Sequence, residues 1–286
     1  MSDKNAAELD LEHLRGWIGR EERVSDVVTP ELVRRFNATL DIEASVPKIG
    51  TPAPPLIHLC LAPTVAATAQ LGPDGHAQRG GFVPPVPLPR RMWAGGEVQF
   101  HNAIRVGDAV ERRSSVKDVD VKPGHSGRLC FVTVEHTLSV EGTPALTEIQ
   151  NIVYRDPTDP SQRARPMPVA ESGAQSRRIQ VSAPLLFRYS ALMFNGHRIH
   201  YDRSYATEVE GYPGLVVHGP LQATLLVHFA AELRGRPPRR FAFRSQAPLF
   251  DDGDFFLHAA EDGDRLSLWT AREGGPVAMR AIASWT

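Results

Sequence analysis

Polar and titratable side chains crowd into the segment Phe194–Asp202, FNGHRIHYD, between stretches that are largely apolar. Asn195, His197 and His200 are its candidates for chemistry, because an imidazole exchanges protons near neutral pH and an amide can hold a water molecule. Their spacing differs from the i, i+4 histidine pair of a helical zinc site, so we expect no metal. The segment therefore predicts acid–base work on a bound water, with helix capping as the structural alternative.

A second candidate feature is the apolar run GYPGLVVHGPL, which ends in His218, Gly219 and Pro220. Pro220 near its start and Gly235 just past its end delimit a long helix that follows this run. The Gly219 N–H at such a helix start is an unpaired donor, which together with the helix dipole can stabilise a developing oxyanion. Glycine also lets a carbonyl approach closely. The alternative is that Gly219 only permits tight packing of the helix on a sheet.

Composition and motifs disfavour several other classes of protein. The net charge of −1 gives no electrostatic basis for nucleic acid or an acidic membrane as the main partner. Cys60 and Cys130 are the only cysteines, which argues against a disulfide framework or a zinc site. There is no G-x-S-x-G, G-x-G-x-x-G or P-loop motif. Without a signal-like N-terminus or a long apolar run, we expect a soluble, cytoplasmic protein with no membrane span.

The chain divides into two halves of similar pattern, each with helical segments followed by strand-like blocks. Residues 1–155 begin with two helices and continue into three or four long antiparallel strands. Residues 156–178 are rich in proline and predict a linker. Residues 179–286 hold a short helix, the polar segment, the long helix and a final strand block. We expect strands in that block near 239–248, 254–261, 264–273 and 276–285.

Residues 50–92 are rich in proline and glycine and cannot form one regular element. A loop this long is usually functional or disordered, and its apolar side chains predict that it packs on the rest of the chain. Within it, residues 58–72, HLCLAPTVAATAQLG, are the best candidate for a central helix of the first half.

The sequence FNGHRIHYDRSYATEVEGYPGLVVHGPL resembles the active-site segment of the MaoC-type (R)-specific enoyl-CoA hydratases and hydroxyacyl-thioester dehydratases. Their pattern is Ser-Gly-Asp-x-Asn-Pro-x-His, followed by an apolar run that ends in His-Gly. The resemblance implies an α+β double hot-dog fold, in which each of two repeats wraps an antiparallel sheet around a long helix. Residues 1–155 would be a degenerate first repeat with a helical N-terminal extension, and residues 179–286 the catalytic repeat.

On this pattern His200 takes the place of the catalytic histidine, and Gly219 that of the glycine whose N–H polarises the thioester carbonyl. Asn195 stands where the pattern has its catalytic aspartate, and His197 stands where it has asparagine. An amide can position water but cannot take its proton at neutral pH. Either His200 does the proton work nearly alone or another group assists it. The nearby supporting candidates are His197, Asp202 and Tyr201.

Asparagine at position 195 also resembles one branch of the family, the hydratases of methyl-branched C5 dicarboxylyl-CoA thioesters. These act on itaconyl-CoA and 3-methylfumaryl-CoA (mesaconyl-CoA) and give citramalyl-CoA. The resemblance implies a hydro-lyase with no cofactor, since the acyl-CoA thioester substrate itself carries coenzyme A. The free carboxylate of such a substrate needs a cationic partner. The candidate substrate-binding residues are Arg90, Arg91, Arg198, Arg203 and His218.

Two other functions stay open on the sequence. One is a dehydratase or enoyl hydratase of straight-chain acyl-CoA or acyl carrier protein, which would need an apolar tunnel for the acyl chain. The other is a non-catalytic acyl-CoA-binding hot-dog protein, for which Asn195 is the best support. Hot-dog repeats commonly pair, so a homodimer is also expected, although two repeats in one chain could satisfy that pairing internally.

Overall fold

The computed structural model describes residues 9–124, 127–156 and 166–286. Over these residues the protein is an α+β structure with one antiparallel sheet of ten strands, in the order β1-β3-β4-β5-β2-β7-β10-β9-β8-β6. The first-half strands are β1 (Glu21–Val27), β2 (Arg90–Phe100), β3 (Ala109–Gly124), β4 (Gly127–Val140) and β5 (Thr143–Arg155). The second-half strands are β6 (Gln175–Ile179), β7 (Arg240–Ser245), β8 (Phe255–Asp262), β9 (Arg265–Ala271) and β10 (Val277–Ser284).

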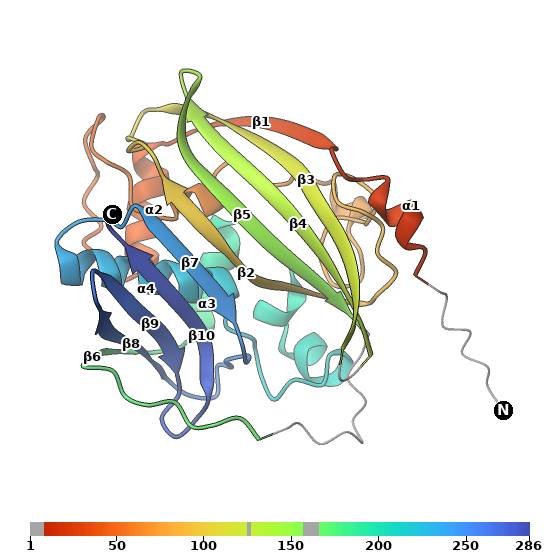
Figure 1. Cartoon of the computed structure of the whole chain (residues 1–286). Coiled ribbons are helices and arrows are strands. Elements are labelled where there is room, and N and C mark those ends of the chain that lie inside the picture. Colours follow the sequence, from red (N-terminus) through yellow and green to blue (C-terminus); the bar gives the residue numbers. More distant parts are fainter. Residues whose placement is uncertain (1–8, 125–126, 157–165) are drawn as a thin grey trace.

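Four α-helices accompany this sheet in the described residues: α1 (Leu11–Arg15), α2 (Pro30–Thr39), α3 (Ala183–Leu192) and α4 (Gly219–Arg234). Short helical turns are η1 (Ile57–Cys60), η2 (Thr68–Gln70), η3 (Arg198–His200) and η4 (Tyr205–Val209). In Figure 1 the sheet is one curved layer, and α2, α3 and α4 lie together behind it. None of the helices in the described parts of the chain is long and apolar enough to cross a membrane.

The pairing of β2 with β7 joins the two halves into one sheet, with Gly95 opposite Arg244 and Gly96 opposite Phe243. A Cβ at Gly95 would lie 2.5 Å from the Phe243 carbonyl oxygen, and one at Gly96 would lie 2.3 Å from the Ile149 carbonyl oxygen. Both glycines are therefore needed for β2 to approach its neighbours on either side. The rings of Trp93 and Phe243 also stack across this seam, with centroids 4.5 Å apart.

Helix α4 is the buried centre of the second half. The predicted boundary signals are confirmed, since Pro220 lies in its first turn and Gly235 ends it in the left-handed region at φ 69°. The helix packs against β7 to β10. Four of its side chains are fully buried: Leu221, Ala223, Leu226 and Ala230. The predicted strands of the final block are confirmed as β7, β8, β9 and β10.

No comparable helix forms in residues 9–124 and 127–156 of the first half, so the expectation for residues 58–72 is wrong. Only η1 and η2 form there, and Ala62 between them has φ 47°. Ala62 precedes Pro63, and a residue before proline is disfavoured in the helical region, which ends the turn that begins at Ile57. The expectation that this Pro- and Gly-rich region packs on the chain is confirmed by Val86 and Leu88, which are fully buried in a cluster with apolar side chains of β3, β4 and β5.

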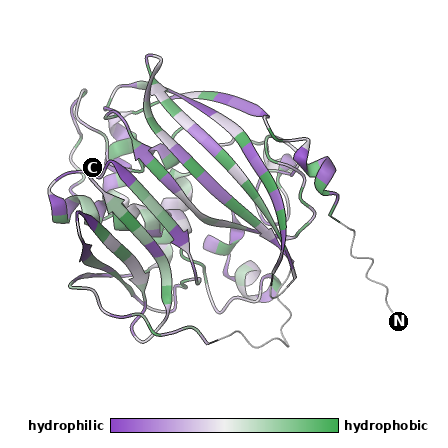
Figure 2. Cartoon of the chain, viewed as in Figure 1, coloured by the Kyte–Doolittle hydropathy of each residue, from purple (hydrophilic) through white to green (hydrophobic). Residues whose placement is uncertain are grey.

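The division into two repeats stays a prediction, although some of its boundaries can be placed on the structure. Part of the expected linker, residues 157–165, lies outside the described residues. Residues 175–178 of the linker range belong to β6, which pairs with β8 at the sheet edge. Residues along β3, β4 and β5 alternate in hydropathy (Figure 2), as expected for strands with one face on the core.

His228 ties α4 to the first half of the chain. Its Nε2–H donates to the carbonyl of Pro55 at 3.0 Å, and its ring lies 5.8 Å from that of Phe36 on α2. Burial lowers the pKa of His228 from 6.5 to about 4. The unfolded chain therefore binds this proton at a higher pH than the folded chain does. The free energy of unfolding should therefore decrease as the pH falls from 6.5 towards 4.

We expect His228→Gln to flatten this pH dependence, because glutamine keeps a donor for Pro55 but cannot be protonated. The loss of unfolding free energy between pH 7 and pH 4 should shrink by roughly 3 kcal/mol, as measured by urea unfolding at each pH. His101→Gln, which removes an exposed histidine, is the matched control. An equal flattening in that control would contradict the assignment.

Candidate active site

A cavity of about 980 Å³ lies between the two halves and is lined by residues from both. The second half contributes the polar segment around Asn195 to His200 together with the start of α4. The first half contributes the loop Asp74–His76, the beginning of β2 and the inner face of β4 and β5. The polar segment is thus part of a cavity wall and not only a helix cap.

His200 lies in η3 and is 7% exposed. Its Nδ1 is 2.7 Å from the carbonyl oxygen of Val216. Because a carbonyl only accepts, Nδ1 must carry the proton, and Nε2 is left as an unprotonated base. Burial and the nearby His197 lower the pKa of His200 to about 3, so the ring is neutral at physiological pH. The site therefore holds an imidazole in the form that can take a proton from water.

The ring of His218 stacks on that of His200. The two imidazoles stack with centroids 3.7 Å apart, and His218 Nε2 lies 2.8 Å from Ser190 Oγ on α3. His218 is fully buried, and burial holds its pKa well below the usual range. It is the residue before the first of α4, so the stack fixes His200 beside the start of that helix. The structure does not place His218 among the residues that line the cavity.

Gly219 opens α4 and lines the cavity. The first N–H groups of a helix have no partner within the helix, so the Gly219 N–H is available to a ligand. A Cβ at this position would lie 3.0 Å from Trp93 Cε3, so the glycine is also required by packing. Both interpretations of Gly219 from the sequence are therefore compatible with the structure.

Asn195 lies in the turn that leads from α3 to η3. Its side-chain Oδ1 accepts a hydrogen bond from the backbone N–H of His197 at 3.0 Å, and the backbone N–H of Asn195 donates to the carbonyl of Ser190. The residue also lines the cavity. Asn195 and His200 are thus brought to the same space, as the sequence predicted.

The sequence did not identify the loop Asp74–His76 as part of the site. The backbone N–H of Arg198 donates to the Asp74 carbonyl at 2.9 Å, which fixes the loop against the polar segment. Asp74 Oδ2 lies 3.0 Å from His76 Nδ1, and the His76 ring lies 4.3 Å from that of His197. The sequence signal was the turn PDG followed by histidine, inside a long loop of the kind that often carries function.

Two residues of this loop and one of the polar segment form the only group in the described part of the chain that could hold a metal ion. Asp74, His76 and His197 each offer a ligand atom, and these atoms lie within 4.8 Å of one another. Spacing within the segment 194–202 could not indicate this group, because two of its members come from the other half.

The candidate arginines differ in the carboxylates with which they already pair. Arg198 pairs with Asp202 at 2.8 Å, and Arg203 pairs with Asp251. Neither arginine lines the cavity. Arg90 lines it but pairs with the Glu210 carboxylate at 3.3 Å and also donates to the Glu210 carbonyl.

Arg91 also lines the cavity and has no carboxylate partner among the residues that the structure describes. Its guanidinium lies 5.9 Å from the centroid of the Tyr154 ring. Of the four arginines, Arg91 is therefore the one left available to a bound anion.

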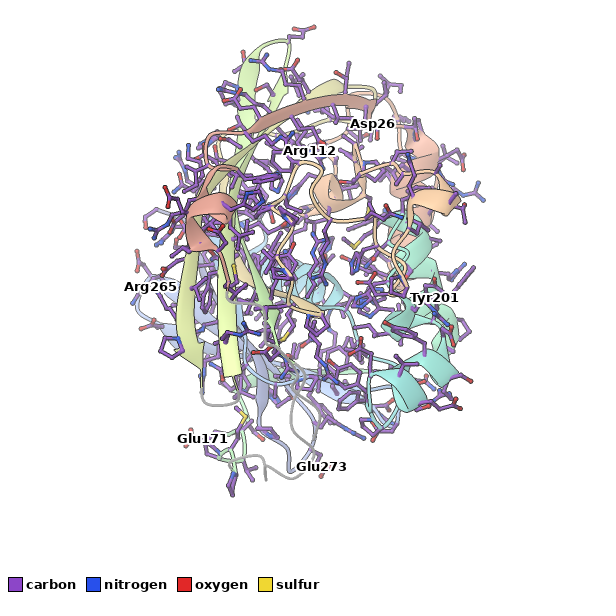
Figure 3. All side chains as sticks on the ribbon, turned by 90° about the vertical axis from the view of Figure 1, so that its right-hand side faces the viewer. Asp26, Arg112, Glu171, Tyr201, Arg265 and Glu273 are labelled. Carbon is purple, nitrogen blue, oxygen red and sulfur yellow. The ribbon has the colours of Figure 1, made fainter. Side chains whose placement is uncertain are left out.

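The two remaining candidates of the segment, Tyr201 and Asp202, differ in position. Tyr201 lines the cavity but is 44% exposed near the edge of the molecule (Figure 3), and its hydroxyl donates to the Gly196 carbonyl. Asp202 is held by Arg198 and accepts the backbone N–H of Tyr205 at 3.1 Å, both of which lower its carboxyl pKa. The structure therefore places Asp202 in a structural ion pair outside the cavity lining.

A second polar group, on η1, β4 and β5, lies within the same cavity and was not predicted from the sequence. Glu148 Oε2 is 3.3 Å from His58 Nε2, and both side chains are 3% exposed. Burial opposes ionisation of Glu148, but the hydrogen bond with His58 and the nearby His136 outweigh it and lower the Glu148 pKa. His136 Nδ1 in turn lies 2.8 Å from Ser114 Oγ. This end of the cavity is therefore polar and hydrogen-bonded.

Gly75 should be essential for closing the loop on the polar segment. It has φ +88°, and a Cβ there would lie 1.9 Å from the Gly196 carbonyl oxygen. We expect Gly75→Ala to lower at least tenfold the rate of the hydration that the family resemblance implies, because the loop must move away from His197 while the distant core stays intact. Gly142→Ala is the matched control, since Gly142 also has positive φ (+77°) but meets nothing within 4 Å. Rates and circular dichroism of both variants decide the point, and equal losses would contradict it.

Comparisons with known proteins agree with this site and fold. The sequence model of the hydroxyacyl-thioester dehydratase type 2 family matches residues 56–251. The chain is 44% identical over 266 residues to the mesaconyl-C(4)-CoA hydratase of Chloroflexus aurantiacus, covering 93% of this chain and 95% of that protein.

Solved structures confirm the fold. HtdX of Mycobacterium tuberculosis superposes with a TM-score of 0.68 at 19% identity, covering 93% of this chain and 100% of that one. A second protein from that organism, described as a double hot-dog fold, gives a TM-score of 0.57 at 14% identity, with 93% and 96% covered. The chain therefore belongs to the MaoC-like hydroxyacyl-thioester dehydratase type 2 family and is a hydro-lyase of acyl thioesters.

Proposed function

We propose that the protein adds water to a methyl-branched C5 dicarboxylyl-CoA thioester, 3-methylfumaryl-CoA or itaconyl-CoA, to give citramalyl-CoA. The observation that carries this proposal is the cavity that combines His200, the Gly219 N–H and an arginine without a carboxylate partner. The activity of the Chloroflexus relative, a mesaconyl-C(4)-CoA hydratase that matches nearly the whole chain, supports the same substrate.

The hydration step follows from the geometry around His200. The thioester carbonyl would accept the Gly219 N–H, so that negative charge developing on its oxygen is stabilised at the start of α4. A water held near Asn195 gives a proton to His200 Nε2 as its oxygen bonds to the β-carbon. The π electrons move to the thioester oxygen as an enolate. The α-carbon then takes up a proton as the carbonyl re-forms, and one water has been added.

Itaconyl-CoA has its double bond outside conjugation with the thioester. It would first need a proton shift through the α-carbon to give the conjugated isomer. The same imidazole and the same N–H donor can carry out that isomerisation, since it too passes through an enolate.

Arg91 is the proposed partner of the substrate's free carboxylate. In 3-methylfumaryl-CoA that carboxylate is bonded to the β-carbon, so its partner must lie close to the attacking water. The charge of Arg91 contributes to lowering the pKa of both His76 and His197, which fits a position beside these rings. We assign Arg198 and Arg203 to holding the segment, and Arg90 to the contact with Glu210.

The alternatives receive less support. A tunnel for long acyl chains should be apolar, whereas this cavity contains Glu148, His58 and His136 on its first-half wall. A protein that only binds acyl-CoA would not need a buried imidazole with its Nε2 kept unprotonated beside a free N–H donor. Location in the cytoplasm and assembly as a homodimer remain predictions from the sequence.

The substrate proposal is tested by hydration assays with 3-methylfumaryl-, itaconyl-, crotonyl- and longer enoyl-CoA. We expect the two dicarboxylate substrates to have the highest kcat/KM. His200→Gln should lower kcat for them by a factor of about 10² or more, because the base is lost. His13→Gln, at an exposed histidine, serves as the control. Activity confined to straight-chain substrates would rule out the dicarboxylate assignment, and an active His200→Gln would rule out the mechanism.

Arg91→Gln separates recognition of the carboxylate from catalysis. Loss of one charged hydrogen-bond partner, worth roughly 1.5–3 kcal/mol, should lower kcat/KM for the dicarboxylate substrate by about 10- to 100-fold. Turnover of crotonyl-CoA, which has no free carboxylate, should stay near the wild-type rate. Arg280→Gln, at an exposed arginine on β10, is the control. Equal losses on both substrates would show that Arg91 does not read the carboxylate.

A further inference from the structure

Asp74 and His76 of the first half and His197 of the second half form a compact group of donor atoms in the cavity wall. One carboxylate oxygen and two imidazole nitrogens lie within 4.8 Å of one another. Proteins use two histidines and one carboxylate to bind a divalent transition-metal ion while leaving coordination positions open to a ligand. The proposed hydration step uses none of these three side chains.

The separation of two of the donor atoms fits a common metal ion. Asp74 Oδ2 lies 3.0 Å from His76 Nδ1. Two atoms that each bind one ion at about 2.1 Å are roughly 3.0 to 3.4 Å apart, for octahedral or tetrahedral angles. An ion could therefore bind both atoms with little movement of either side chain. The same separation is that of a hydrogen bond, so the third donor has to distinguish the two arrangements.

His197 supplies this third donor. The residue is only 8% exposed, yet neither of its ring nitrogens has a hydrogen-bond partner among the residues that the structure describes. Its ring lines the cavity and lies 4.3 Å from that of His76, centroid to centroid. Buried polar side-chain atoms nearly always have a partner, so an imidazole left without one beside the Asp74–His76 pair points to a bound ligand.

Backbone contacts hold the three side chains in place without an ion. The Arg198 N–H donates to the Asp74 carbonyl at 2.9 Å, and the Arg198 guanidinium donates to the Pro73 carbonyl at 3.0 Å. Asp74 Oδ1 accepts the backbone N–H of His76 at 3.1 Å, which orients the carboxylate and leaves Oδ2 for an ion. Outer contacts of this kind orient metal ligands and strengthen metal binding.

The surroundings of the group give an ion access and favour an anionic further ligand. Asp74 and His76 line the 980 Å³ cavity and also a neighbouring cavity of about 600 Å³, so an ion can reach them. Arg91 lines both cavities as well. One carboxylate does not neutralise a divalent ion near a guanidinium, so the open coordination positions favour an anion.

We propose that Asp74, His76 and His197 bind a divalent transition-metal ion of the Zn²⁺ type, and that this ion together with Arg91 receives the free carboxylate of the substrate. Binding of the ion does not depend on the reaction, whereas its contact with the carboxylate rests on the proposed function. The ion holds one end of the substrate and adds no covalent step to the hydration. The spacing of residues 194–202 could not predict this site, because two of its ligands come from the other half of the chain.

Metal binding is tested on the chelator-treated, folded protein with Zn²⁺ alone and with Co²⁺ alone. We expect one ion per chain by equilibrium dialysis, and visible absorption bands from the bound Co²⁺. Asp74→Asn, His76→Gln and His197→Gln should each weaken binding at least tenfold, because each removes one ligand. His101→Gln, at an exposed histidine, is the matched control and should bind as the wild type does. Circular dichroism shows whether each variant is folded, and the wild-type titration decides the point where one is not.

The role of the ion is tested with two substrates. Removal of the ion should lower kcat/KM for 3-methylfumaryl-CoA at least tenfold and change that for crotonyl-CoA, which has no free carboxylate, less than threefold. Added Zn²⁺ should restore the wild type but not His197→Gln. His200→Gln should still bind one ion although its hydration activity is lost, which separates the metal site from the base.

Four outcomes would contradict the proposal or one part of it. Failure of the folded wild type to bind either ion would leave Asp74 and His76 as a hydrogen-bonded pair only. Binding unchanged in all three ligand variants would place the ion elsewhere on the chain. Full activity without the ion, or equal losses on both substrates, would rule out its contact with the carboxylate. A wild type that hydrates neither dicarboxylate thioester would overturn the proposed function and this contact, whereas the dialysis result would still decide whether the ion binds.

Discussion

The antiparallel contact between β2 and β7 is the constraint on which the rest of the molecule depends. It is possible because Gly95 and Gly96 place no Cβ between β2 and its neighbours, where the nearest carbonyl oxygens would be 2.3 to 2.5 Å away. With this seam closed, the two halves share one sheet and one principal core, in which α2 and α4 meet. The same closure brings the loop at Asp74–His76 onto the polar segment of the second half. The cavity exists only because both halves are joined.

Burial of uncompensated imidazoles dominates the electrostatics of the site. His197, His200 and His218 are each less than 9% exposed, and burial lowers the pKa of all three. Neutral rings can stack and contact one another without repulsion, which permits the 3.7 Å stack of His200 on His218. Neutrality also leaves each ring able to accept a proton. Asp74 bonds to a fourth ring, that of His76, which lies 4.3 Å from the His197 ring.

The first half of the chain forms the opposite wall of the cavity. No long central helix forms in residues 9–124 and 127–156, and η1 together with the inner faces of β4 and β5 borders the cavity there. The polar groups His58, His136 and Glu148 line that space in place of an apolar tunnel. The hydrogen bond from His58 and the nearby His136 lower the pKa of Glu148 despite its burial, so this wall favours a short polar ligand over a long hydrocarbon chain.

Local sequence predicted the features of the fold that depend on residues close together in the chain. Pro220 and Gly235 delimit α4, and strand-like segments separated by turns predicted the final block, because caps, turns and periodicity act within a few residues. The order and spacing of Asn195, His200 and Gly219 likewise identified the family and one wall of the site. Sequence failed for residues 58–72, where apolar content suggested a helix that Pro63 interrupts.

Tertiary structure alone decided which distant residues share the cavity. The loop at Asp74–His76 and the segment at Asn195–His200 are more than 100 residues apart, and only the closed sheet sets them in contact. Ion pairing distinguishes arginines that looked alike in sequence: Arg90, Arg198 and Arg203 pair with carboxylates, whereas Arg91 has no carboxylate partner in the described part of the chain. Local sequence thus determined the elements and one set of reactive groups, because these depend on near neighbours. Contacts between distant segments, which depend on how the whole sheet packs, determined their partners.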